Sequence, residues 1–154
     1  MRRANTGGAN HRMRTVEELE AKLAEPSAAL IEDMKRIDGD IMLLGVGGKM
    51  GPSLARLAMN AIAAAGVKKR VIGVSRFSSG GLREELEAAG VETIACDLLD
   101  DAALRSLPEV PNVIYMAGNK FGTTGREWFT WAMNSYLPGR VAEKFRSSRI
   151  VVFS

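Results

Sequence analysis

Residues 41–51 read IMLLGVGGKMG, an apolar run of strand length that passes directly into a cluster of glycines. Residues 51–65 follow, and they are rich in alanine and leucine over the length of a helix. Glycines between a strand and a helix allow a tight turn and a close approach of the backbone to a phosphate group. The amides and the positive dipole end of the helix then meet the phosphate. The stretch therefore predicts a phosphate-binding turn, and a purely structural glycine turn is the alternative.

The rest of the chain alternates between apolar segments of strand length and segments with helical periodicity. Parallel strands need crossover connections, and the connecting helices cover both faces of the sheet. We therefore predict a doubly wound α/β fold of Rossmann type, with about five parallel strands in the order 3-2-1-4-5. The predicted strands are 41–44, 70–75, 91–95, 111–116 and 149–153, and the predicted helices are 51–65, 81–89 and 125–145, with a helical turn near 100–106.

The segment before the first strand divides into two parts. Residues 1–14 are polar, contain four arginines and no acid, and are predicted to be a disordered basic leader. Residues 15–38 are predicted to form an N-terminal helical appendage, because Thr15 and Ser27 are good N-cap residues ahead of helical patterns. Residues 39–154 form the sheet domain. We expect this domain to be truncated, because functional loops normally begin where its last strand stops.

Composition excludes several classes of partner. Without the four arginines of the leader the formal net charge falls from +3 to −1, so the sheet domain has no basic field for nucleic acid. A leader that touches a polyanion or targets the mitochondrion is the alternative. No apolar run approaches the roughly twenty residues that cross a membrane. The single cysteine, Cys96, allows no internal disulfide, which suits the cytoplasm, and metal-ligand spacing of Cys and His is absent.

The spacing of the glycines is informative. Gly45, Gly48 and Gly51 give G-x-x-G-x-x-G, whereas a strict G-x-G-x-x-G needs glycine in place of Met50, and no Walker loop follows Lys49. With this turn on its first strand, the sequence resembles the extended short-chain dehydrogenase/reductase family, which contains NAD-dependent epimerases and dehydratases. The resemblance covers about residues 40–154, the cofactor-binding part only. It implies that Gly45, Gly48, Lys49, Met50 and Gly51 of this turn bind NAD or NADP.

The ends of the second and third strands agree with the family pattern. NAD-selective members usually present a carboxylate where this chain has Ser75, and the guanidinium of Arg76 suits a ribose 2′-phosphate. The resemblance therefore favours NADP over NAD, with an exposed arginine at a strand end as the alternative. Asp97 and Leu98 resemble the family's pair that reads the adenine edge, although Asp97 is also suited to cap the next helical turn.

The end of the fourth strand and the helix after it complete the predicted cofactor site. Met116, Ala117 and Gly118 resemble the small-residue segment that lets the cofactor pass over the sheet edge, and Lys120 matches a lysine that approaches its polar part. A plain strand-to-loop turn with a solvated lysine is the alternative. Asn134 matches a family asparagine that braces the fourth strand, or it is a surface residue.

Aromatic residues gather near the start of helix 125–145. Trp128, Phe129 and Trp131 lie close together in the sequence, and Tyr136 follows one turn on. Their ordinary explanation is packing or a buried partner surface. Members of the resembled family often pair through this helix, so the resemblance implies a possible homodimer.

The catalytic pattern of the resembled family is missing. That family uses a serine or threonine and a Tyr-x-x-x-Lys pair, in which the tyrosine acts as acid or base. Here Tyr115 is followed four residues later by Asn119, and Tyr136 is followed by Arg140. We therefore predict no catalytic residue and no metal ligand in this chain, and no turnover by the chain alone.

Three functions remain at this stage. The first is the NAD(P)-binding domain of an epimerase, dehydratase or reductase that acts on a sugar nucleotide or a related carbonyl or alcohol substrate. The second is a non-catalytic dinucleotide sensor, favoured by the missing tyrosine and lysine pair. The third is an S-adenosylmethionine methyltransferase, which the non-acidic end of the second strand disfavours, because a carboxylate usually holds the ribose diol there.

Overall fold

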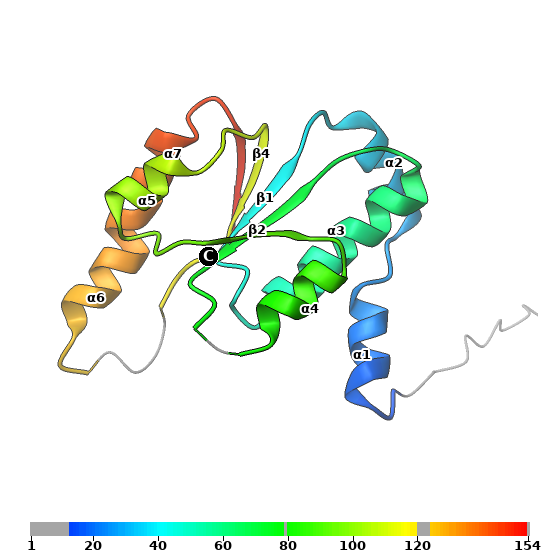
Figure 1. The fold of residues 1–154 in the computed structure, drawn as a ribbon, viewed down its shortest axis with the longest axis horizontal. Coiled ribbons are helices and arrows are strands. Elements are labelled where there is room, and N and C mark those ends of the chain that lie inside the picture. Colours follow the sequence, from blue (N-terminus) through cyan, green and yellow to red (C-terminus); the bar gives the residue numbers. More distant parts are fainter. Residues whose placement is uncertain (1–12, 79, 120–123, 154) are drawn as a thin grey trace, which may run out of the picture.

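The computed structural model describes residues 13–78, 80–119 and 124–153. These residues form a five-stranded sheet in which all strands are parallel and follow the order β3-β2-β1-β4-β5 (Figure 1). The Rossmann-like α/β fold and the strand order predicted from the sequence are therefore confirmed. The strands are β1 (Ile41–Leu44), β2 (Val71–Ser75), β3 (Glu92–Ala95), β4 (Asn112–Tyr115) and β5 (Arg149–Val152).

Helices precede the sheet and connect its strands. In the described part of the chain, none of them is long and apolar enough to span a membrane. They are α1 (Val16–Leu23), α2 (Ala28–Arg36), α3 (Gly51–Ala65), α4 (Leu82–Ala88), α5 (Asp101–Ser106), α6 (Glu127–Trp131), the π-helical turn η1 (Ala132–Tyr136) and α7 (Leu137–Lys144).

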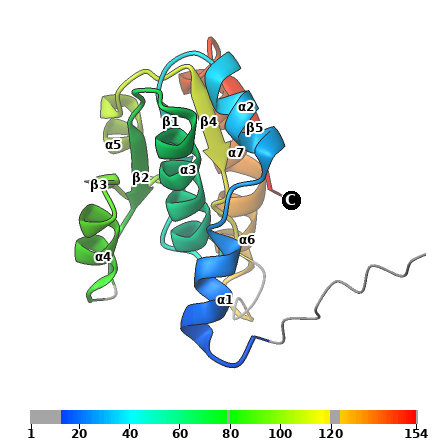
Figure 2. The same cartoon turned by 90° about the vertical axis from the view of Figure 1, so that its right-hand side faces the viewer.

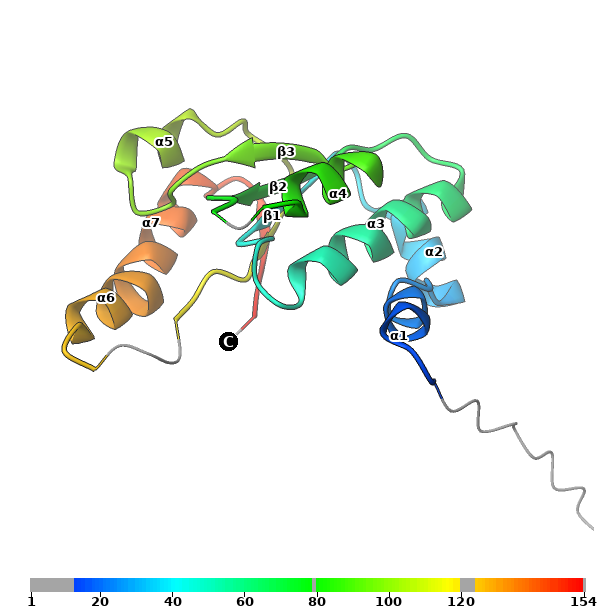
Figure 3. The same ribbon diagram turned by 60° about the horizontal axis from the view of Figure 1, so that its bottom comes forward.

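The central strand β1 is buried over its whole length because helices cover both faces of the sheet. Ile41 and Leu43 pack with α2, α3 and α4 on one face, whereas Met42 and Leu44 pack with α5 and α7 on the other. Figure 3 shows these two groups of helices on opposite sides of the strands. Burial on both faces explains why β1 reads as a continuous apolar run instead of an alternating one.

Helix α3 packs unusually close to the sheet at its first residue. A methyl group on Gly51 would overlap the carbonyl group of Val46, so only glycine fits there. Ala55, Ala58 and Ala61 continue the buried side of the helix with small side chains. The third glycine of the motif therefore has a packing role, which is to let α3 lie against the end of β1.

The N-terminal helices α1 and α2 lie on the outer side of α3 (Figures 1 and 2). Thr15 and Ser27 cap them, as predicted, by accepting hydrogen bonds from backbone amides three residues on. Arg56 of α3 pairs with Glu20 of α1 at 3.0 Å, and the same guanidinium also contacts Glu85 of α4. The appendage is thus joined to the covering layer of the sheet by polar contacts.

One predicted element differs from the structure. The sequence predicts a continuous α-helix over 125–145, whereas the chain forms α6, then the π-helical turn η1, then α7. The prediction was wrong in the middle of this segment, and the cause is a proline whose effect is described with the site below.

We expect Gly51→Ala to lower the free energy of unfolding by about 3 kcal/mol, because the added methyl group forces α3 away from Val46. Gly139→Ala is the matched control. Gly139 lies in the first turn of α7 with nothing within 4 Å of an added methyl group, so alanine should stabilise the helix by up to about 0.5–1 kcal/mol. Urea denaturation followed by circular dichroism measures both changes. Equal effects in the two variants would contradict the packing role of Gly51.

Candidate functional site

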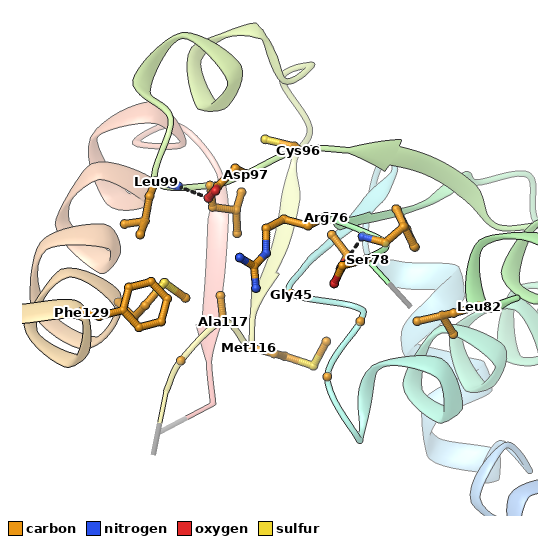
Figure 4. Close-up of a pocket in the computed structure, with 17 residues that line it drawn as sticks. Gly45, Arg76, Ser78, Leu82, Cys96, Asp97, Leu99, Met116, Ala117 and Phe129 are labelled. Atoms are coloured by element: carbon orange, nitrogen blue, oxygen red, sulfur yellow. Dashed lines mark hydrogen bonds between the residues drawn. The ribbon is translucent and has the colours of Figure 1, made fainter. Parts of the chain in front are cut away.

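The carboxyl ends of four strands, β1 to β4, meet at one edge of the sheet, and a cavity of about 240 Å³ lies there (Figure 4). Ligands bind parallel sheets at this edge, at the point where strand order reverses, which here is between β1 and β4. The cavity brings together predicted residues from four separate segments: Gly45, Gly48, Ser75, Arg76, Asp97, Leu98, Met116, Ala117 and Gly118.

The glycine turn touches the strands on either side of β1. Gly45 has a φ of 91°, and a methyl group on it would lie 2.8 Å from the amide nitrogen of Ala117. A methyl group on Gly47 would overlap the hydroxyl of Ser75 at the end of β2. A methyl group on Gly48 would meet nothing closer than a backbone oxygen at 3.4 Å, although Gly48 lines the cavity. Packing against backbone therefore requires glycine at 45, whereas a methyl group at 47 would force only the Ser75 side chain to move, and Gly48 leaves open space at the cavity.

The start of α3 adjoins the glycine turn. This 15-residue helix has Met50 at its N-cap, and among the described residues no side chain caps its first amides. The Gly51 amide donates to the carbonyl oxygen of Gly48, and Pro52 has no amide hydrogen, so the positive potential at this end of α3 comes chiefly from the helix dipole. Lys49 and Met50 are exposed beside the cavity and do not line it. This end of α3 is therefore suited to an anion such as a phosphate.

The chain turns sharply after β2 and directs Arg76 into the cavity. Phe77 has a φ of 48° and is the one non-glycine residue with a positive φ in the described ranges. That backbone conformation costs about 1–2 kcal/mol, which the packing of Phe77 on the α3 side of the sheet offsets. Figure 4 shows the Arg76 guanidinium pointing into the cavity. No described carboxylate forms an ion pair with it, so the cation is available to a ligand.

The loop after β3 separates two roles that the sequence left open. Asp97 lines the cavity, and one of its carboxylate oxygens accepts a hydrogen bond from the amide of Leu99 at 3.0 Å. The cap of α5 is Asp100, which accepts from the amides two and three residues on. Asp97 is therefore not the helix cap.

Burial, with nearby carboxylates, raises the pKa of the Cys96 thiol, so this thiol stays protonated at neutral pH.

Asn134 clamps the backbone just beyond β4. Its side-chain amide donates to the carbonyl oxygen of Asn119 at 2.7 Å, and its side-chain oxygen accepts from the amide of Asn119 at 2.9 Å. A methyl group on Gly118 would lie 3.4 Å from the same side-chain oxygen. Asn134 thus braces the segment that follows β4, but it does not line the cavity itself.

The turn η1 exists because of Pro138. Proline has no amide hydrogen, and in an α-helix its ring clashes with the carbonyl group four residues earlier. The chain widens by one residue before it: the amide of Leu137 donates to the carbonyl oxygen of Ala132, five residues back. The proline therefore turns a predicted α-helical segment into a π-helical one.

The carbonyl group of Met133 loses its helical partners at this turn. In an α-helix this carbonyl group would accept a hydrogen bond from the amide of Leu137, but that amide donates to Ala132. In a π-helix it would accept from the amide of residue 138, which is a proline and has no amide hydrogen. The Tyr115 hydroxyl instead donates to the Met133 oxygen at 3.2 Å. Burial raises the pKa of Tyr115 to about 12, so the hydroxyl keeps its proton for this bond. Tyr115 therefore joins the end of β4 to the π-helical turn.

Some predicted residues lie outside the cavity lining. Gly51, the first residue of α3, packs against Val46. Lys49 and Met50 lie beside the cavity, and Asn134 braces the segment after β4. Lys120 lies outside the described residues. The sequence did not predict a second set of lining residues: Gly47, Phe77, Ser78, Leu82, Cys96, Leu99, Phe129 and Met133. Of these, only Gly47 could have been predicted from its place in the glycine cluster.

Comparison with known proteins shows the fold. No family model matches the sequence, and no curated protein is significantly similar to it. The Bordetella bronchiseptica enzyme WbmF in complex with NAD+ and UDP matches with a TM-score of 0.60 and 20% identity, over 77% of this chain and 36% of WbmF. WbmF in complex with NAD+ matches over the same shares, with a TM-score of 0.57 and 18% identity. The chain thus spans about a third of the length of these solved structures.

We expect Tyr115→Phe to lower the free energy of unfolding by about 1–3 kcal/mol at neutral pH, because the carbonyl group of Met133 is left without a donor. The difference should depend on pH. The pKa of this tyrosine is raised to about 12 in the folded protein, against about 10 in an unfolded chain. Its contribution to stability is therefore complete below pH 10 and is lost as the pH rises through 12.

Urea denaturation of both proteins at several pH values tests this expectation. The stability difference between the wild type and Tyr115→Phe should be constant up to about pH 10 and should shrink above it. A difference that stays constant through pH 12 would show that the hydroxyl is not held as the structure has it.

Proposed function

We propose that this chain is the NAD(P)-binding domain of an enzyme similar to the epimerases, dehydratases and reductases of the extended short-chain dehydrogenase/reductase family. The observation that carries the proposal is the cavity, which combines the glycine turn, the start of α3 and the Arg76 cation at the carboxyl ends of the strands. The substrate is a sugar nucleotide or a related carbonyl or alcohol compound. Support comes from WbmF, an enzyme of the same fold that holds NAD+ and UDP in its complex.

Each part of the cavity fits one part of a dinucleotide. The start of α3 and the open side of Gly48 suit the pyrophosphate. Asp97, with its neighbour Leu98, suits the adenine edge, and the segment from Met116 to Gly118 offers small or flexible side chains where the cofactor passes β4. Bound NAD(P) supplies the hydride chemistry, and these residues supply binding and orientation.

The end of β2 favours NADP over NAD. Ser75 stands where a carboxylate would hold the ribose hydroxyls of NAD, and it carries no charge. Arg76 places a planar cation with five donors beside it, which matches a phosphate group on that ribose.

Neither tyrosine of the described residues is placed to act as the acid or base of the reaction. The Tyr115 hydroxyl is buried, donates to a backbone carbonyl and has a pKa raised to about 12, so it holds its proton at neutral pH. Tyr136 is exposed, and the guanidinium of Arg140 lies over its ring at 5.9 Å from the centroid and pairs with Asp101 at 2.9 Å. The chain alone therefore has no turnover in this proposal. Detectable NADP-linked oxidation or reduction by the purified chain would contradict it.

A non-catalytic dinucleotide sensor is the second candidate, and one observation favours it. The segment formed by α6 and η1 lines the cavity with Phe129 and Met133, and it also exposes Trp128 and Trp131, which are 66% and 70% accessible. A ligand in the cavity and a partner on the surface, including a second copy of this chain, would thus contact the same short helix. Light scattering of the chain with and without NADP+ separates the candidates, because an enzyme domain requires no change of assembly.

We expect saturable binding of NADPH, NADH and ADP-ribose by calorimetric titration, with NADPH the tighter of the two cofactors. Arg76→Ala should weaken the binding of NADPH by about tenfold to a hundredfold, which is the usual contribution of hydrogen bonds to a charged group. It should change the affinity for NADH little. The matched control is Arg83→Ala, an exposed arginine of α4 that pairs with Glu87 and does not line the cavity.

The outcomes separate the parts of the proposal. A folded chain that binds none of the three ligands contradicts the NAD(P)-binding function itself. If the wild type binds both cofactors and Arg76→Ala loses affinity for NADPH and NADH equally, only the preference for NADP is contradicted.

A further inference from the structure

The cavity has two chemically different halves. Toward β1 and β2 it is lined by glycines, by the Arg76 cation and by the side chains of Phe77 and Leu82, whereas toward α6 and η1 it is lined by the apolar side chains of Leu99, Phe129 and Met133. Figure 4 shows Phe129 and Leu99 on one side of the Arg76 guanidinium and Gly45 on the other. A nucleotide has the same division, with charged phosphates at one end and a flat, largely apolar base at the other.

Phe129 and Met133 form a continuous apolar surface. They are four residues apart, so they lie on the same side of the helix that α6 and η1 form. Both side chains are half-buried and reach the cavity. The ring of Trp128 packs edge-on against the ring of Phe129, with 5.6 Å between centroids and 75° between planes, and supports it from the solvent side. An aromatic ring beside a thioether suits contact with another flat ring.

The sheet holds this surface in place. The Tyr115 hydroxyl bonds to the carbonyl oxygen of Met133, and the Asn134 side chain bonds twice to the backbone of Asn119. The first contact joins the π-helical turn to the end of β4, and the second joins it to the segment that follows β4. Met133 is therefore held by hydrogen bonds at its own carbonyl group and at the next residue.

We infer that Phe129 and Met133 form the wall against which the base of the bound nucleotide stacks, opposite Leu98 and Leu99. Asp97 lies at the same end of the cavity, where its carboxylate accepts a hydrogen bond from an amino group on the base. The adenine of the proposed cofactor has both features, a flat face and an amino group. This inference rests on the proposed function, because a nucleotide must occupy the cavity, and it adds a wall that comes from the helix after β4.

The test compares two ligands that differ by the base. We expect the wild-type chain to bind adenosine 5′-monophosphate more tightly than ribose 5-phosphate in calorimetric titrations. Phe129→Ala should weaken the binding of adenosine 5′-monophosphate and NADP+ by about tenfold to a hundredfold, the usual effect of removing an aromatic partner of a base. It should leave the affinity for ribose 5-phosphate unchanged. Met133→Ala should act in the same direction with a smaller effect.

Two further variants control for folding. Trp131→Ala removes another aromatic ring of α6, which is 70% exposed and does not line the cavity, and it should bind adenosine 5′-monophosphate nearly as the wild type does. Phe129→Leu keeps an apolar side chain without a ring and should bind with intermediate affinity, so it carries the test if the alanine variant does not fold. Melting temperatures identify the folded variants.

Each result has one meaning. A wild-type chain that binds neither adenosine 5′-monophosphate nor NADP+ overturns the proposed function and this inference with it. A wild-type chain that binds both, with Phe129→Ala and Phe129→Leu binding as tightly as the wild type, overturns the wall alone. Equal losses for ribose 5-phosphate and adenosine 5′-monophosphate also overturn the wall, because the base is then not the group that Phe129 contacts.

Discussion

The contact of the glycine turn with both neighbouring strands is the constraint on which the structure depends. Gly45 lies against Ala117 beyond β4, Gly47 lies against Ser75 at the end of β2, and Gly51 lets α3 lie on Val46. Side chains at Gly45 and Gly51 would push the segment after β4 and helix α3 away from the turn. The cavity, the position of the α3 amides and the placement of Arg76 beside the turn all follow from this close approach.

The parts of the fold that could be predicted are those that local pattern determines. The bounds of α3, Gly51–Ala65, match the prediction because a glycine turn starts the helix and Gly66, at a φ of 66°, ends it. The strand order followed from the alternation of strands and helices and from the rule of right-handed crossovers. The turn η1 was not predicted, because it needs both Pro138 and a distant donor, Tyr115, to satisfy the carbonyl group that the wider turn releases.

The candidate site divides in the same way. Residues at strand ends, such as Arg76 and Asp97, could be placed at the cavity because parallel strands end at a common edge. Phe129 and Met133 were not predicted there, because their spacing shows only that they share a helix face and not which neighbour that face meets. The choice between Asp97 and Asp100 as helix cap was equally undetermined, because both are aspartates close to the start of α5.

The π-helical turn makes the far wall of the cavity depend on the number of residues in the chain as well as on their identity. Each helical residue turns the chain by about 100° about the helix axis. The extra residue in η1 therefore determines how far the side-chain faces of α6 are rotated relative to those of α7. Loss of one residue between Ala132 and Tyr136 would rotate Phe129 away from the cavity while α7 stayed packed in the core. In evolutionary terms, this segment should reject single-residue insertions and deletions.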